Sequence, residues 1–332
     1  MNRLPTVTVL SMCYNKADTI VRCYESLRNQ TCRDFEWIIV NDGSTDNILD
    51  LVPLFEDDLF DVIFIDKPNE GIAPTWNKGV EQARGKLIFR VDPDDWVYPT
   101  AIENIIIYST LLDSDSHLCG LVFQSTFEDG DIVGYHPFNE EVTRCDFNSF
   151  RIIYKAIGDR AEVCLKSVFE EFKWPYYLDE KFYPESVMWR KIADKYDALY
   201  INVPIYIREY GDNCISANNS AVMRKNPKGY MDGSISQICA IMKYPYTVER
   251  VFMCIKIACN YFRYGMYSNI SCKEMIGRLP TLYLKLLFLP GIMLHVIDRY
   301  FPSFIHSIVS KFKKEKSILK RDRNNNKYNS NI

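Results

Sequence analysis

Three carboxylates within four residues are the densest chemical signal in the sequence. The run VDPDDW at residues 91–96 supplies Asp92, Asp94 and Asp95 directly after a short apolar segment. Carboxylates this close repel one another, and a cation between them relieves the repulsion. Oxygen ligands in a loop that also meets phosphate groups suit Mg²⁺ or Mn²⁺. The sequence therefore predicts a metal on Asp92 and Asp94, and the alternative is a solvated turn.

Other polar clusters end the earlier apolar runs. The first run ends in SMCYN at residues 11–15, which places Tyr14 to contact a base, and the second ends in NDGSTD at residues 41–46. The carboxylate of Asp42 is able to accept a hydrogen bond from the imide N–H of a uracil. Three further clusters precede the aspartates: NEG at 69–71, WNKG at 76–79 and ARG at 83–85.

The segments between these clusters alternate in hydrophobic period. Apolar runs at residues 6–13, 35–40, 62–65 and 86–91 alternate with helix-period segments at 19–29 and 72–83. This alternation predicts βαβ units and a mostly parallel sheet. Ligands of open α/β sheets bind beyond the carboxyl ends of the strands, so the clusters should converge on one crevice.

Several function classes are excluded. The sequence has no G-x-G-x-x-G, and Gly79 to Lys86 departs from a P-loop in its spacing and in having Leu87 after the lysine. The chain carries a net charge of −3, of which residues 311–332 contribute +6, leaving −9 on the remainder. An acidic body argues against nucleic acid as the partner, whereas a basic end suits anionic lipid headgroups.

Taken in order, the clusters resemble the family 2 glycosyltransferases of the GT-A fold. That family has a Tyr-Asn step after its first strand, Asp-Gly-Ser-x-Asp after the second and an Asp-x-Asp metal motif after the fourth. The resemblance is dense over residues 5–98. It implies an α/β fold: a GT-A type nucleotide-binding sheet of mixed, mostly parallel strands flanked by helices, with a helical C-terminal extension. The nucleotide-sugar contacts that it implies are Tyr14, Asn15, Asp42, Gly71, Asn77, Asp92 and Arg208.

Farther along, GDRAEV at 158–163 and FYPESVMW at 182–189 resemble bacterial surface-polysaccharide enzymes. Many family members carry a Glu-Asp pair before a helix, and its second member takes the acceptor proton. Glu185 falls on that second position and Pro184 on the first, so one carboxylate stands where the family has two. The alternative for Glu185 is a carboxylate stabilised by the helix dipole. Asp159 and Glu162 are candidate acceptor contacts or part of a surface turn.

Tyr206, Arg208 and Tyr210 lie where the family often places residues that face the diphosphate. For Arg208 the alternative is an ordinary surface arginine.

The resemblance implies an inverting hexosyl- or hexosaminyltransferase. It would move sugar from a nucleotide sugar, a UDP-sugar in our expectation, to a glycan or lipid-linked acceptor in cell-surface polysaccharide synthesis, with Mn²⁺ or Mg²⁺. One alternative is a non-catalytic sugar-nucleotide or glycan-binding relative, against which the aspartate cluster and Glu185 both argue. Another is a nucleotidyltransferase, which normally has a basic Gly-rich loop near the N-terminus, and residues 11–18 contain no glycine. Product analysis distinguishes the last alternative, because a glycosyltransferase releases UDP and a nucleotidyltransferase releases pyrophosphate.

We expect a catalytic domain at residues 1–217, with its nucleotide-sugar half at 1–98 and its acceptor half at 99–217. A helical region at 218–310 should follow, with helices at 246–264 and 272–289, and then a basic, disordered tail at 311–332.

The eleven cysteines form no C-x-x-C pair, and the start of the sequence runs straight into a strand pattern. Both features predict a cytoplasmic protein without a signal peptide. The apolar stretch 279–296 contains Pro280, Lys285 and Pro290, which favours an interfacial or buried helix pair over a membrane span. We therefore expect peripheral contact with the inner face of the cell membrane. The rival interpretation is that these helices pack on the catalytic domain or on a second copy, as in a homodimer.

Overall fold

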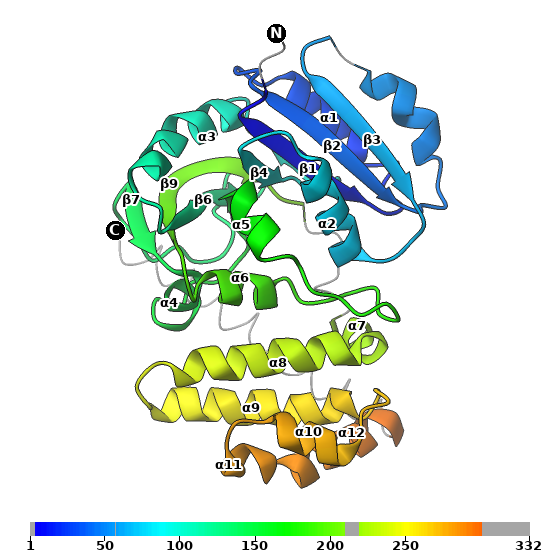
Figure 1. Cartoon of the computed structure of the whole chain (residues 1–332), viewed down its shortest axis with the longest axis vertical. Helices are drawn as coiled ribbons and strands as arrows, with labels where there is room; N and C mark the ends of the chain where they lie inside the picture. Colours follow the sequence, from blue (N-terminus) through cyan, green and yellow to red (C-terminus); the bar gives the residue numbers. More distant parts are fainter. Residues whose placement is uncertain (1–3, 57, 210–218, 301–332) are drawn as a thin grey trace, which may run out of the picture. The chain divides into compact units, whose positions relative to one another are not determined.

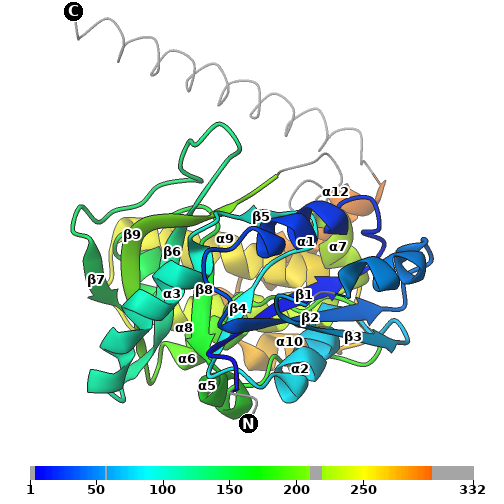
Figure 2. The same ribbon diagram turned by 90° about the horizontal axis from the view of Figure 1, so that it is seen from above.

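The computed structural model of this chain describes residues 4–56, 58–209 and 219–300. The chain divides into two compact units, Met1–Lys243 and Tyr244–Ile332, and each is described by itself. Figures 1 and 2 give two views coloured along the sequence. Tyr210 and the predicted basic tail at 311–332 lie outside the described residues.

A nine-stranded sheet is the centre of the first unit, in the order β3-β2-β1-β4-β8-β6-β9-β5, with β7 paired to β9. The strands β1 to β4 are parallel neighbours, as the sequence predicts. Beyond β4 the sheet is mixed, because β8 runs antiparallel to both β4 and β6 while β6 and β9 are parallel. The strands are β1 Val7–Cys13, β2 Phe35–Asp42, β3 Asp61–Lys67, β4 Leu87–Arg90, β5 Trp96–Val97, β6 Leu118–Thr126, β7 Val142–Cys145, β8 Ala161–Leu165 and β9 Asp197–Ile207.

Helices cover both faces of this sheet and form two cores. One core takes α1 (Ile20–Arg28), η1 (Ile48–Phe55) and α3 (Ala101–Ser109), which η2 (Thr110–Ser114) follows. The other takes α2 (Ile72–Gln82), α4 (Phe147–Ile152), α5 (Lys166–Glu171) and α6 (Ser186–Ile192). Side chains along β2 alternate between them, with Trp37 in the first core and Ile38 in the second. A strand buried on both faces is therefore apolar almost throughout.

The first unit continues through α7 (Asn219–Lys225) and α8 (Pro227–Met242) to Lys243, past the boundary predicted at residue 217. Hydrogen bonds at the start of α8 explain the extension. The carboxylate of Glu180 accepts from the backbone N–H groups of Lys228 at 2.7 Å and Gly229 at 2.8 Å. Asn226 Oδ1 in turn accepts from the N–H groups of Lys181 and Phe182.

The second unit is helical, as predicted, and contains α9 (Val248–Gly265), α10 (Cys272–Arg278), α11 (Leu282–Lys285) and α12 (Phe288–Tyr300). Phe262 of α9 packs edge-on against Phe288 of α12, with ring centroids 5.3 Å apart. The prediction of one helical segment over 272–289 was wrong. The chain leaves the helix at Leu279 because the residue before a proline is disfavoured in the helical region.

Within the described ranges, no helix has both the length and the apolar character needed to cross a bilayer.

Candidate functional site

Polar groups from the carboxyl ends of β1, β2 and β4 line one cavity of about 680 Å³. Parallel pairing sets Cys13 beside Asn41, so the loops after these strands leave the sheet at the same edge. The convergence expected from the sequence is therefore confirmed for these three clusters. Among the lining residues are Tyr14, Lys16, Asp42, Gly71, Asp92, Asp94, Asp95 and Arg208.

A smaller cavity of about 270 Å³ adjoins the larger one. Arg90, Asp92, Asp159 and Arg208 line both, so the two spaces share a wall. Glu185 lines the smaller cavity but not the larger one. The remaining residues around the smaller cavity are Phe147, Arg151, Glu162, Ser186 and Trp189.

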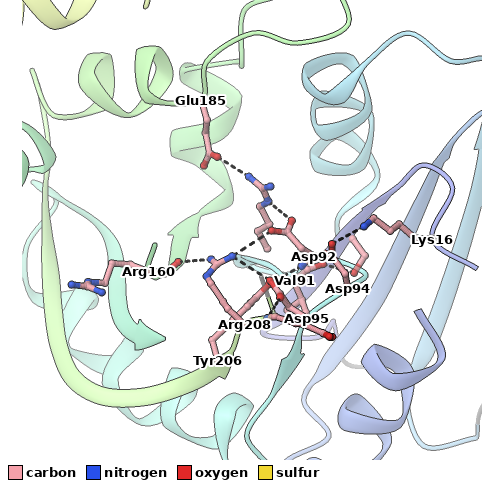
Figure 3. A network of polar contacts seen from close by, with 12 residues as sticks. Lys16, Val91, Asp92, Asp94, Asp95, Arg160, Glu185, Tyr206 and Arg208 are labelled. Carbon is pink, nitrogen blue, oxygen red and sulfur yellow. Dashed lines mark hydrogen bonds and ion pairs between the residues drawn. The ribbon is translucent and has the colours of Figure 1, made fainter. Parts of the chain in front are cut away.

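Each carboxylate of the aspartate cluster has its own partner (Figure 3). Asp92 accepts from Arg90 Nε at 2.7 Å and lies 3.5 Å from Arg208 Nη1. Asp94 Oδ2 lies 2.7 Å from Lys16 Nζ. Protein cations therefore relieve part of the mutual repulsion that the sequence suggested.

Asp95 is buried and positions the end of β9. It accepts from the Tyr206 hydroxyl at 2.9 Å, from Arg208 Nη1 at 3.2 Å and from the backbone N–H of Glu209 at 2.9 Å. The same Tyr206 hydroxyl accepts from the N–H of Asp92 at 2.8 Å. Asp95 thus fixes the loop that carries Asp92 and holds Arg208 at the shared wall.

The pKa values of Asp92 and Asp95 shift in opposite directions. Burial alone would raise the pKa of Asp92, but Arg90 and Arg208 lower it below its ordinary value, so Asp92 stays ionised. Burial, followed by the charge of Asp92, raises the pKa of Asp95 to about 7. The pKa of Arg90 lies above its ordinary value because Asp92 and Glu185 outweigh the effect of burial. Arg90 therefore remains a cation between two carboxylates.

Glu185 directly precedes α6, and its side chain makes no capping hydrogen bond to that helix. Instead, Oε2 accepts from Arg90 Nη1 at 2.6 Å and Oε1 accepts from Trp189 Nε1 at 2.6 Å. In Figure 3 the Glu185 carboxylate points toward the aspartate cluster. The side chain is thus aimed at the cavity wall and does not cap the helix.

Asp94 and Asp92 are the residues available for a metal. In the part of the chain that the structure describes, no group of three or more His, Cys, Asp or Glu is arranged to hold one. Mg²⁺ is usually bound by only one or two carboxylates together with substrate phosphates. Asp94 is 36% exposed on the larger cavity, and Lys16 contacts only its Oδ2. These residues fit an ion that a phosphorylated ligand helps to hold.

Three of the residues predicted to contact the nucleotide sugar line the larger cavity. Tyr14 is half exposed on the larger cavity. Gly71 has φ +103°, and a Cβ there would lie 2.3 Å from the Lys181 carbonyl oxygen, so the position requires glycine. Asp42 accepts three hydrogen bonds, from Lys67 Nζ and the N–H groups of Glu70 and Gly71. A carboxylate has about four acceptor positions, which leaves one for a ligand.

Two predicted residues use their side chains elsewhere. Asn15 Oδ1 accepts from the N–H of Thr45 at 2.7 Å and ties the first loop to the second. The Asn77 amide bonds both backbone groups of Trp174, at 2.8 and 3.0 Å. Neither asparagine is among the described residues that line the two cavities. Lys16 and Arg90, which the sequence prediction missed, lie there instead.

Part of the chain is similar in sequence to known proteins. Residues 8–144 match the family model described as Glycosyl transferase family 2. Hyaluronan synthase of Pasteurella multocida is 42% identical over 103 residues, which is 31% of this chain and 11% of that relative. Chondroitin synthase of Pasteurella multocida (strain Pm70) is 41% identical over 103 residues, covering 31% of this chain and 11% of the relative. The matches thus span less than a third of either relative.

Among solved structures, S. aureus TarS 1-349 in complex with UDP-GlcNAc aligns with a TM-score of 0.57. The alignment covers 89% of this chain and 91% of that one at 15% sequence identity. Agreement over this length at so low an identity demonstrates a shared fold.

Proposed function

Since this chain carries a family 2 glycosyltransferase domain of the GT-A fold, we propose that it transfers a hexosyl or hexosaminyl group from a nucleotide sugar to a hydroxyl of an acceptor. The observation that carries the proposal is the wall shared by the two cavities. Asp92 belongs to both, with Asp94 on the larger side and Glu185 on the smaller. A donor in one space and an acceptor in the other would meet at that wall.

The larger cavity would hold the donor. Its volume of about 680 Å³ falls in the usual range for small-molecule sites. Tyr14 offers a ring face to a base, and Asp42 keeps one acceptor position for an imide N–H, which supports a UDP-sugar. Arg208 would face the diphosphate. TarS, a solved protein of the same fold, holds UDP-GlcNAc in one of its structures, so UDP-sugars come first among the donors to test.

Asp94, with Asp92 beside it, would hold a Mn²⁺ or Mg²⁺ ion. When bound, such an ion offsets the negative charge that grows on a departing diphosphate. Lys16 and Arg208 face the same region and add positive charge from the protein itself. Arg90 and Arg208 hold the Asp92 carboxylate in place on the shared wall.

Glu185 would act as the base. An acceptor oxygen attacks the anomeric carbon, the bond from that carbon to the diphosphate oxygen breaks, and the hydroxyl proton passes to the Glu185 carboxylate. A single displacement of this kind inverts the anomeric configuration. Arg90 and Trp189 hold the two carboxylate oxygens and so orient the base.

The second unit supports a peripheral place at the cytoplasmic face of a membrane, where a lipid-linked acceptor is available. One face of α12 carries four exposed side chains at helical spacing: Leu289, Met293, Val296 and Tyr300. In the sequence, the segment 311–332 with its net charge of +6 follows. Each basic residue near an anionic surface contributes about 1 kcal/mol, which adds to a weak apolar contact. Synthesis of a cell-surface polysaccharide is the role that fits this combination.

The decisive experiment incubates the purified full chain with a panel of nucleotide sugars and Mn²⁺ or Mg²⁺. We expect release of the nucleoside diphosphate from one donor class, and its loss when EDTA is added. Release of pyrophosphate would instead identify a nucleotidyltransferase. Binding of a nucleotide sugar without turnover, in the presence or absence of acceptors, would identify a non-catalytic relative.

A further inference from the structure

Glu162 differs from the other carboxylates around the two cavities. Asp92 and Glu185 pair with Arg90, and Asp94 pairs with Lys16. In contrast, the Glu162 carboxylate lines the smaller cavity with no hydrogen bond or ion pair to any described residue. Glu162 is half buried, so inside the cavity its carboxylate can accept hydrogen bonds from water or from a ligand hydroxyl.

The position of Glu162 is set by the sheet, not by a loop. It is the second residue of β8, directly opposite Val122 of β6, and the next residue, Val163, pairs with Phe89 of β4. Strand neighbours on both sides fix the backbone at this point. The carboxylate therefore has a defined direction into the cavity before any ligand arrives.

The cavity wall around Glu162 has two kinds of surface. Trp189 and Phe147 stack with ring centroids 6.3 Å apart and an interplanar angle of 25°, and both line the cavity. Trp189 also donates to Glu185. Apolar ring surface beside hydrogen-bond acceptors suits a pyranose, which has an apolar C–H face and an equatorial rim of hydroxyl donors.

The cations at this cavity already have partners. Arg90 bonds Asp92 and Glu185, and Arg208 bonds Asp95. Arg151 donates to the carbonyl oxygens of Ala156 and Gly158. A uronate or phosphate entering here would face the Glu162 and Glu185 carboxylates, and like charges at close range repel.

We propose that Glu162 is a second acceptor-binding carboxylate, which accepts a hydrogen bond from an acceptor hydroxyl next to the one that Glu185 deprotonates. The smaller cavity then takes a neutral, hydroxyl-bearing sugar. This inference rests on the proposed glycosyl transfer. It also accounts for Pro184, because a strand of the sheet supplies the carboxylate that the residue before Glu185 lacks.

The electrostatic environment agrees with this geometry. Burial raises the pKa of Glu162 to about 7, and the Glu185 charge adds to the rise, whereas Arg208 and Arg151 oppose it. Asp159 raises it further. Arg90 and Asp92 also line the cavity, and they pair with each other. A donor hydroxyl would stabilise the ionised form of Glu162 and remove part of the cost of its burial.

The test compares Glu162→Gln with Glu170→Gln, a surface control on α5. UDP release from the best donor is measured alone and with methyl β-D-glucopyranoside, methyl β-D-galactopyranoside, N-acetylglucosamine or glucuronic acid. We expect a neutral sugar to stimulate release in the wild type and the control. In Glu162→Gln that stimulation should fall about 10- to 100-fold, the loss expected for a hydrogen bond to a charged group. Release without added sugar should be unchanged in the control Glu170→Gln.

Full stimulation in Glu162→Gln would overturn the proposal. So would a wild-type protein that glucuronic acid alone stimulates, or one that none of the neutral sugars stimulates. Saturation-transfer NMR with the same sugars measures binding without turnover. Sugar contacts that weaken in Glu162→Gln in a protein that releases no UDP would support the sugar site while refuting the glycosyltransferase. A wild-type protein that neither releases UDP nor shows sugar contacts by NMR would refute both the glycosyl transfer and the sugar site.

Discussion

Arg90 Nη1 lies 2.6 Å from Glu185 Oε2, and this contact joins the wall shared by the two cavities to the proposed base. Through Nε the same guanidinium bonds Asp92. A single side chain of β4 therefore orients one carboxylate of the shared wall and one of the smaller cavity.

Replacing Arg90 by Gln should lower both stability and turnover. Glu185 loses its cation and Asp92 keeps only Arg208, which we expect to cost up to about 3 kcal/mol of unfolding free energy. The turnover number should fall more than the donor KM changes, because Glu185 loses its orientation. Urea denaturation and steady-state kinetics measure the two effects. Arg90→Lys, which keeps the charge, should recover part of the turnover; equal losses in both variants would contradict an electrostatic role.

Asp94→Asn should abolish metal-dependent turnover while leaving the fold intact. Asp94 is over a third exposed and pairs only with Lys16 at 2.7 Å among the described residues, so its loss should change stability by less than about 1 kcal/mol. UDP release titrated with Mn²⁺, beside a thermal melt of the same sample, checks both statements. Wild-type activity in this variant would remove Asp94 from the metal site.

Glu185→Gln should lower kcat on the order of 10²-fold or more, with little change in donor affinity, because a general base contributes about 10²- to 10⁴-fold. The amide still accepts from Trp189, so the local structure should persist. Transfer kinetics and isothermal titration of the donor separate the two quantities. If donor binding were lost while kcat was retained, Glu185 would be a donor-positioning residue.

Glu162→Gln should stabilise the protein in a pH-dependent way. The pKa of Glu162 rises from its ordinary value of 4.5 to about 7 in the folded state, so the unfolded chain loses this proton first as the pH increases. Stability therefore falls between about pH 4.5 and 7, and the loss is complete above that range. The variant should melt with the wild type at pH 4 and above it at pH 8. A melting difference independent of pH, or shared by Glu170→Gln, would argue against a raised pKa of the half-buried Glu162 carboxylate in the folded state.

The exposed face of α12 should mediate membrane contact. Leu289→Ser combined with Met293→Ser should lower cosedimentation with phosphatidylserine vesicles at least about tenfold, since burying each side chain contributes about 1.5–3 kcal/mol. Leu178→Ser, at an exposed leucine of the first unit, is the matched control. A full-length protein that remains in the supernatant at low salt would rule out the membrane. A vesicle-independent dimer disrupted by the double substitution would assign the face to a second copy.

The sequence predicts some parts of this molecule better than others. The parallel strands β1 to β4 are predicted because apolar runs alternate with helix-period segments over residues 6–91, whereas no such alternation surrounds the short elements α4, β7 and β8. The position of Glu185 follows from its place before α6. Its contact with Arg90 does not, because these residues meet through the packing of α6 into the same core as β4, which no local pattern in the sequence indicates. Likewise, nothing local in the sequence indicates that Asn77 bonds Trp174.

The hydrogen bonds at the start of α8 determine how short a functional fragment of this protein can be. Asn226 lines the larger cavity and accepts the N–H groups of Lys181 and Phe182, and the Lys181 carbonyl accepts from the N–H of Ile72 beside Gly71. A fragment ending at residue 217 would remove one side of the cavity and leave those backbone donors unmatched. The smallest autonomous piece that retains an intact pocket should therefore reach Lys243, and grafting this pocket into another protein would require α8 to accompany it.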